Sequence, residues 1–292
     1  MLIRTIFDLI VNQIQRQISN PTLYMRMTIT IDKFVKDTFA VDIDIFLNAL
    51  KLSPNAQGYI IGAISELLLK NYMENLGYEL KRIKEKWEGT KHKNHRGDFY
   101  IRKKGTKQWF VLESKGVKSN SEKWHKLNLY KPLHNFLKNN LDKLQPYGIL
   151  DVPTLINEIF PGLENGIKMY SVEDIRHKIT VLETHFVSGA KSESSGRTIA
   201  TPRRDEFHVV SLDLFLRTGK HQFVFANSKQ LDVSESDSNH LKQNYIVDVL
   251  ITNKKENLNI QKPWSENFNE IFTTLESPIN EKDMQIDTRN CL

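Results

Sequence analysis

Cysteine is almost absent from this chain: the one cysteine among 292 residues is Cys291, next to the C-terminal residue. Disulfide bonds within the chain and cysteine-based zinc sites are therefore excluded, which suits a reducing compartment. Apolar runs are also short. None approaches the roughly 20 residues of a membrane span, and Arg4 and Asp8 interrupt the apolar start. We therefore expect a cytoplasmic protein that has no membrane partner.

Motifs that would define several other functions are missing as well. The sequence has no glycine-rich phosphate loop of the G-x-x-x-x-G-K type, no zinc-finger spacing, no internal repeat and no helix-turn-helix pattern. ATP is therefore not an expected partner. Hydrophobic residues make up 39% of the chain and aromatic residues 10%, which is the composition of a folded globular protein. The formal net charge of +6 favours an anionic partner.

The most informative feature that is present is a pair of β-type runs, residues 97–101 and residues 111–115. The turn sequence Lys104-Gly105-Thr106-Lys107 joins them, and glycine supplies the backbone freedom that a tight turn needs. A turn centred between Gly105 and Thr106 pairs residues whose numbers sum to 211. The two runs therefore predict an antiparallel β-hairpin with a defined register.

This register brings two acids and a lysine together. Asp98 lies directly opposite Glu113, and directly opposed residues share one face of a sheet with Cβ atoms only about 5 Å apart. Lys115 projects to the same face because side chains alternate along a strand. Two adjacent carboxylates repel each other unless a cation lies between them, and hard oxygen ligands suit Mg²⁺. The pair predicts a Mg²⁺ site for phosphodiester hydrolysis; the alternative is a hairpin whose charges only face solvent.

Asp98, followed after fourteen residues by Glu113-Ser114-Lys115, resembles the motif of the PD-(D/E)XK nuclease superfamily, to which most restriction endonucleases belong. The resemblance covers about residues 55–190 and implies an α/β fold with an α-β-β-β-α-β core. It implies that Asp98 and Glu113 bind Mg²⁺ (or Mn²⁺), with the Ser114 carbonyl as a further ligand, and that Lys115 is catalytic. Gly97 stands where the family often has proline.

The resemblance also implies a catalytic glutamate on the helix that precedes the strands, and Glu66 is the candidate. Residues 55–76 have apolar residues at helical spacing, and Glu66 lies at the edge of that stripe. Ser53 and Pro54 fit the start of such a helix. The alternative is a solvated glutamate that pairs with Lys70, four residues further on.

The elements that we expect follow the order of the family core. A strand at residues 78–83 precedes the hairpin, a basic amphipathic stretch at residues 121–144 follows it, and the last core strand is expected at residues 179–187. Three regions result: a helical region 1–54, the nuclease core 55–190, and an extension 191–292 that contains β-strands and could form one compact unit with the core.

In the extension we expect strands at residues 207–216 and 221–226. The apolar spacing favours helices at residues 240–251 and 264–275, and the last seventeen residues have the composition of a frayed tail.

Basic side chains predict two DNA contacts. One is the charged run before Asp98, which would steer a phosphate backbone towards the acids, and the other is a flexible Ser/Gly-rich loop with its basic end, where arginine could read guanine. The alternative for both is an ordinary solvated loop. The candidates are Lys91, Lys93, Arg96, Arg197, Arg203 and Arg204.

These inferences together predict a type II restriction endonuclease that cuts double-stranded DNA with Mg²⁺. Cleavage of both strands at a symmetric site calls for two active sites, so a homodimer is expected from the resemblance and from symmetry. Two alternatives remain open. One is a nuclease of the same superfamily in repair, junction resolution or transposition, and the other is a nucleic-acid-binding module of this fold that has lost catalysis.

Overall fold

The structure is a computed structural model, and the chain divides in it into two compact units, Met1–Ile64 and Ser65–Leu292. No helix among the residues that it describes is both long enough and apolar enough to span a lipid bilayer. The described residues are 31–84, 97–118, 123–145, 148, 151–186, 190–191, 198–199, 201–252 and 258–288.

The described part of the first unit is helical, as expected. Residues 31–39 are helical, and α3 (Ile43–Leu52) follows; residues 1–30 of the expected helical region lie outside the described ranges. The chain then enters α4 (Pro54–Asn75). Its start was predicted correctly, because the Ser53 hydroxyl accepts the Ala56 N–H at 3.3 Å.

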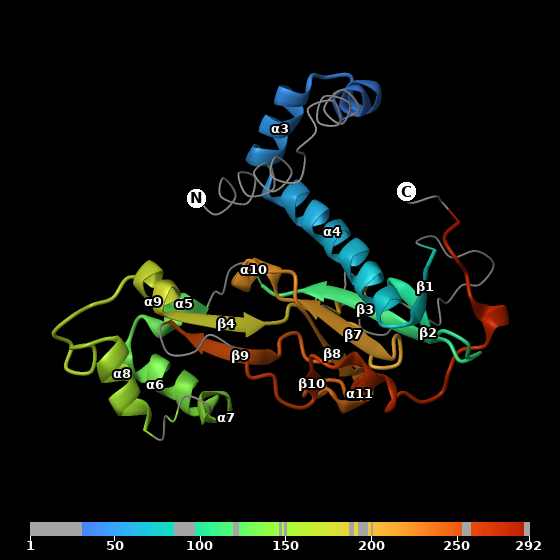
Figure 1. The fold of residues 1–292 in the computed structure, drawn as a ribbon. Coiled ribbons are helices and arrows are strands. Elements are labelled where there is room, and N and C mark those ends of the chain that lie inside the picture. The colour runs from blue at the N-terminus through green and yellow to red at the C-terminus, as the bar shows by residue number, and fades with distance from the viewer. Residues whose placement is uncertain are drawn as a thin grey trace. The chain divides into compact units, whose positions relative to one another are not determined.

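The second unit contains a mixed six-stranded sheet with the order β1-β2-β3-β7-β8-β10 (Figure 1). All neighbouring strands are antiparallel except β3 and β7, which are parallel. The expected α/β class is confirmed. The strands are β1 (Tyr78–Arg82), β2 (Phe99–Lys103), β3 (Phe110–Gly116), β7 (Val209–Asp213), β8 (Phe223–Asn227) and β10 (Trp264–Ser265).

The register of the β2–β3 hairpin is the predicted one. Phe99 lies opposite Leu112 and Ile101 lies opposite Phe110, so the residue numbers of each pair sum to 211. Gly105 in the turn has a φ of 85°, a value that side-chain-bearing residues rarely adopt. The turn is therefore built around the glycine that identified it in the sequence.

A group of helices and a small sheet follow β3 in the chain and are gathered together in Figure 1. They share a core of their own, which includes Trp124, Leu133, Ile156 and Phe160. The expected basic amphipathic stretch forms the first three of these helices. The elements are α5 (Lys123–Leu127), α6 (Tyr130–Lys138), α7 (Leu141–Leu144), α8 (Val152–Ile159), α9 (Val172–Lys178), and β4 (Ile179–Glu183) paired with β9 (Ile246–Ile251).

The remaining elements are short. Strand β5 pairs with β6. The helix expected at residues 264–275 is shorter in the structure, where it is α11, because residues 264–265 form β10. These elements are β5 (Ala190–Lys191), β6 (Thr198–Ile199), α10 (Phe215–Thr218), η2 (Ser228–Gln230), α11 (Phe268–Phe272) and η3 (Glu281–Asp283).

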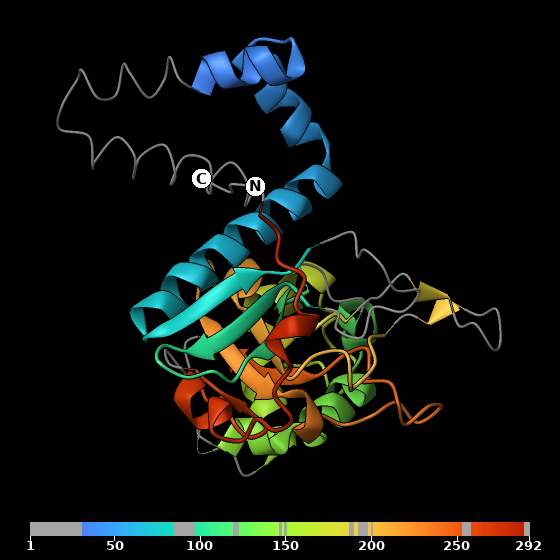
Figure 2. The same ribbon diagram turned by 90° about the vertical axis from the view of Figure 1, so that its right-hand side faces the viewer.

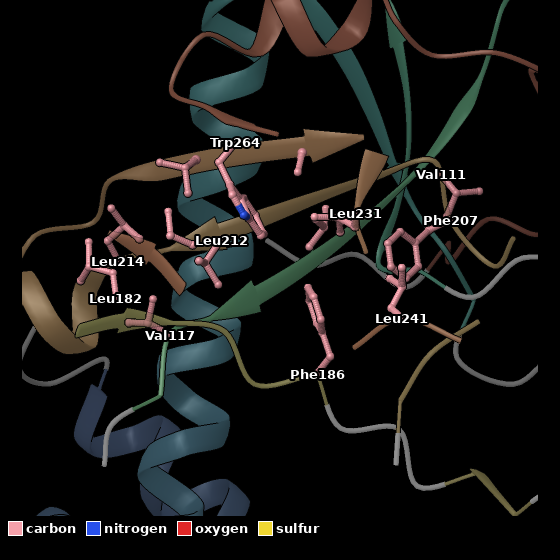
Figure 3. Close-up of a cluster of buried hydrophobic side chains, with 14 of the residues drawn as sticks. Val111, Val117, Leu182, Phe186, Phe207, Leu212, Leu214, Leu231, Leu241 and Trp264 are labelled. Atoms are coloured by element: carbon pink, nitrogen blue, oxygen red, sulfur yellow. The ribbon is translucent and has the colours of Figure 1, made fainter. Parts of the chain in front are cut away.

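Successive side chains of β3 point to opposite faces of the sheet and pack in two different apolar clusters. Phe110 and Leu112 pack with Leu69 and Met73 of α4 on one face. Val111 belongs to a different cluster, which fills the other face and joins side chains from β3, β4 and β7 (Figure 3). The main members of this second cluster are Val111, Val117, Leu182, Phe186, Phe207, Leu212, Leu214, Leu231, Leu241 and Trp264.

Two expectations about the later strands are corrected. The strand expected at residues 179–187 is β4, but it pairs with β9 in a separate two-stranded sheet, and β7 is the strand beside β3. Residues 240–251 were predicted to be helical, and this is wrong because residues 246–251 form β9. Pairing with β4 outweighs the helical spacing, and the β-branched residues of this segment favour a strand.

The C-terminal segment is not a frayed tail where it is described. It runs beside the first strands of the sheet (Figure 2), with Ile279 bridged to Trp109 and Ile286 bridged to Ile83. The Ile279 N–H donates to the Trp109 carbonyl at 2.8 Å, and the Asp287 N–H donates to the Arg82 carbonyl at 2.9 Å. These contacts could not be predicted from the residue pattern, because backbone groups make them.

Removal of residues 277–292 should therefore destabilise the second unit. The truncation deletes several backbone hydrogen bonds, each worth about 1 kcal/mol, and uncovers Trp109. We expect the free energy of unfolding in urea to fall by about 3 kcal/mol or more. A shorter truncation that ends the chain at Thr288 keeps all the contacts named above and is the control. An unchanged urea midpoint in the longer truncation would contradict the packing of this segment.

Candidate active site

Asp98, which directly precedes β2, lies next to Glu113 of β3, as the register requires. The Asp98 N–H donates to the Leu112 carbonyl at 3.0 Å, which continues the pairing of the two strands beyond Phe99. The Asp98 carboxylate in turn accepts the N–H of Ser114 at 2.7 Å through Oδ2. These two hydrogen bonds hold Asp98 against β3 on either side of Glu113.

Lys115 joins the two acids on the same face of the sheet. Its Nζ lies 2.5 Å from Oε1 of Glu113, and the exposed fractions of the two side chains are 28% and 14%. Val111 of β3 and Val117, the residue directly after β3, flank them at alternate positions and belong to the buried cluster of this face. The ion pair therefore stands at the border of an apolar core, where water screens it little.

This environment changes the ionisation of Glu113. Burial, and next the negative charge of Asp98, raise the pKa of Glu113 to about 7, although Lys115 acts in the opposite direction. Burial alone would lower the pKa of Lys115, but the negative charges of Glu113, Asp98 and Glu66 outweigh it and raise that pKa. The site thus contains a carboxyl group that is half ionised near neutral pH and an ammonium group that stays charged.

Glu66 of α4 contributes to this electrostatic environment but is also engaged elsewhere. Its Oε2 lies 2.9 Å from Nη2 of Arg82 on β1, and its side chain is 19% exposed. Lys70, the alternative partner considered from the sequence, pairs with Glu74 instead at 3.9 Å. Glu66 is therefore neither a solvated charge nor paired with Lys70, and its negative charge acts on Lys115.

The donor set at this site fits a hard divalent cation. Two carboxylates stand side by side, and their repulsion is one cause of the raised pKa of Glu113. A cation between them would relieve that repulsion, and Mg²⁺ is commonly held by one or two protein carboxylates and several waters. Within the described ranges no group of three or more His, Cys, Asp or Glu side chains is placed to hold a metal ion. Ser114, the further ligand that the resemblance implies, donates its N–H to the Asp98 carboxylate.

The two described arginines among the DNA-binding candidates are both held by the chain itself. The guanidinium of Arg203 donates two hydrogen bonds of 2.9 Å to the carboxylate of Asp205. Arg204 donates to the carbonyl of Lys229. The other four candidates, Lys91, Lys93, Arg96 and Arg197, lie outside the described residues.

The structure adds two features near β3 that the sequence did not indicate. Glu206 lies close enough to Glu113 for its charge to contribute to the raised pKa of that residue. Asp213, at the end of β7, is 3% exposed and contacts Nδ1 of His221 at 2.7 Å. The position of Asp213 beside β3 depends on the pairing of β7 with β3, which joins segments far apart in the chain. The spacing of Asp213 and His221, eight residues apart, is local, but it matches none of the motifs considered from the sequence.

No protein-family model matches this chain, and comparisons with curated proteins and with solved structures found no significant similarity. The interpretation of the site therefore rests on its own geometry and chemistry.

Binding of Mg²⁺ should depend on pH through Glu113. Because the pKa of Glu113 is raised to about 7, less of this group is ionised at pH 6 than at pH 8, and the cation needs the ionised form. At a fixed, subsaturating Mg²⁺ concentration, we expect a larger rise in Tm at pH 8 than at pH 6. Glu113→Gln should remove most of this rise at both pH values. Equal rises at pH 6 and pH 8 in the unmodified protein would contradict the assignment.

When no metal is added, the raised pKa of Glu113 makes the folded protein more stable at low pH than at high pH. The unfolded chain ionises Glu113 near its ordinary value of 4.5, and the folded chain ionises it near 7. Protonated Glu113 therefore stabilises the folded chain fully below pH 4.5, and this stabilisation is lost as the pH rises through 7. A scan of Tm against pH in EDTA provides the baseline for the Mg²⁺ experiment.

Proposed function

We propose that this chain is a Mg²⁺-dependent endonuclease of the PD-(D/E)XK class that cuts double-stranded DNA at a specific sequence, as a type II restriction enzyme does. The observation that carries the proposal is the convergence of Asp98, Glu113 and Lys115 on one face of the β2–β3 hairpin. The three groups share one environment, which supports the interpretation of their spacing as a catalytic motif.

The order of the elements supports the same proposal. Helix α4 is followed by β1, β2 and β3, then by a helical segment, and then by β7, which lies beside β3 in the sheet. This is the order α-β-β-β-α-β that the resemblance implies, with β7 in place of β4 as the last strand. The strands β4 to β6 are then additions between the helices and β7.

The residues of this site have separate roles in hydrolysis. Asp98 and Glu113 would hold the cation, which when bound supplies a Lewis acid at the scissile phosphate and acidifies a water. Lys115, charged and only 28% exposed, would orient the attacking water and stabilise the negative charge that develops on the phosphate. Glu66, which pairs with Arg82, would stabilise the charged form of Lys115 through its negative charge.

DNA recognition is proposed for the basic segments named from the sequence. The net charge of +6 supports an anionic partner. Because Arg203 is paired with Asp205, it would have to exchange that carboxylate for a guanine or a phosphate when DNA binds. A homodimer would present two such sites to a symmetric sequence.

Digestion of plasmid DNA tests the proposal directly. We expect discrete fragments in Mg²⁺ or Mn²⁺ and no cleavage in EDTA. Asp98→Ala and Glu113→Ala should each abolish cleavage and still show a cooperative thermal transition, because both residues serve the site and are not part of the apolar clusters. Lys107→Ala, an exposed lysine in the same hairpin, is the control and should cut normally. Undiminished cleavage in EDTA would refute the metal site, and nicking that depends on DNA structure would favour a repair or junction nuclease.

Lys115→Ala should separate catalysis from binding. The variant should still bind DNA in Ca²⁺, which is expected to support binding without hydrolysis, because Asp98 and Glu113 remain. We expect the single-turnover rate in Mg²⁺ to fall by about 100-fold or more, since the contact of Lys115 strengthens as the transition state forms. A near-normal rate would show that Lys115 only neutralises Glu113.

A further inference from the structure

Gly97, the residue before Asp98, lies close against Val111 and Leu112 of β3. A Cβ atom at this position would lie less than 3 Å from Cγ1 of Val111 and 3.0 Å from the carbonyl oxygen of Leu112. Distances below about 3 Å are not found for real Cβ atoms, so one of the partners would have to move. Val111 is fully buried in the apolar cluster of its face (Figure 3), and protein interiors are close-packed, so its displacement would disturb its neighbours.

This close approach is coupled directly to the placement of Asp98. The next backbone N–H after Gly97 belongs to Asp98 and donates to the same Leu112 carbonyl at 3.0 Å. The Asp98 carboxylate accepts from Ser114 at 2.7 Å, one residue further along β3. A side chain at position 97 would therefore push the backbone away from β3 at the point where both hydrogen bonds start.

We propose that Gly97 is a positioning residue: its lack of a side chain lets Asp98 approach β3 closely enough for the Ser114 amide to orient the carboxylate beside Glu113. This inference rests on the proposed metal site. It also explains why the chain has glycine where the resemblance often has proline, because proline carries a Cβ atom that would meet Val111 in the same way. A displacement of about 1 Å at such a ligand costs about 100-fold in rate in comparable sites.

The same hairpin contains a matched glycine for comparison. Gly116 ends β3, directly after Lys115, and a Cβ atom there would meet nothing within 4 Å. Gly97→Ala and Gly116→Ala therefore add the same methyl group at the two ends of the site. Only the first addition meets buried atoms.

The first experiment measures metal binding through the rise in Tm on titration with Mg²⁺ at pH 8. We expect Gly97→Ala to need at least about tenfold more Mg²⁺ than the unmodified protein for the same rise, and to cut plasmid DNA correspondingly slowly. Gly116→Ala should titrate like the unmodified protein. A normal titration of Gly97→Ala would overturn the inference.

A second substitution tests the physical cause. Val111→Ala removes the Cγ1 atom that the new methyl group would meet, so the double variant Gly97→Ala/Val111→Ala should regain the Mg²⁺ response of Val111→Ala alone. A purely structural defect at Gly97 would instead add to that of Val111→Ala. Failure of the double variant to recover, while Val111→Ala responds normally, would overturn the inference. If Gly97→Ala does not fold, the comparison of the double variant with Val111→Ala gives the same answer.

The steric contact can also be measured without any metal. In EDTA, urea unfolding of the four proteins of this cycle should show that Gly97→Ala is less destabilising in the Val111→Ala background than in the unmodified protein. An absence of coupling would refute the contact. If the coupling is present but the unmodified protein shows no response to Mg²⁺ or Mn²⁺, the proposed function fails and the steric account of the hairpin stands.

Discussion

The register of the β2–β3 hairpin is the constraint on which the candidate site depends. A slip of one residue would move one strand's side chains to the opposite face, so that Asp98 and Glu113 could not meet. The register is held at the turn by Gly105 and at the other end by the close approach of Gly97 to Val111. The positions of Asp98 and Glu113 therefore depend on glycine and valine residues, which carry no charge.

The chemistry of the site comes from a conflict between packing and charge. Alternation along β3 places Glu113 and Lys115 between Val111 and Val117, on the face that buries the larger apolar cluster. Burial opposes ionisation of Glu113, Asp98 adds repulsion, and Lys115 offsets only part of it. A carboxyl group in this condition gains more from a divalent cation than an exposed one does. In the proposed metal site, the apolar core would thereby contribute to metal affinity although none of its atoms would be a ligand.

The parts of the fold that could be predicted from sequence are those determined by neighbours along the chain. The hairpin follows from one turn and the alternation of side chains, and α4 follows from its capping residue and its apolar spacing. The position of β7 beside β3, the strand β9 and the packing of the C-terminal segment depend on partners far away in the chain. For this reason the proximity of Asp98, Glu113 and Lys115 could be predicted, whereas the influence of Glu206 and the pairing of Glu66 with Arg82 could not.

The parallel pairing of β3 with β7 has a consequence for how the protein is made. Residues 117–208 lie between these two strands in the chain. Strand β3 therefore cannot pair with β7 until all of these residues have been synthesised. Long-range pairing of this kind is slow to form because a large loop must close first. On the ribosome, the β2–β3 hairpin would emerge early but remain open on the side of β7, and the carboxylates of Asp98 and Glu113 would stay hydrated. The environment that perturbs Glu113 can arise only after β7 has left the exit tunnel, so the nascent chain would not yet have the site of the finished protein.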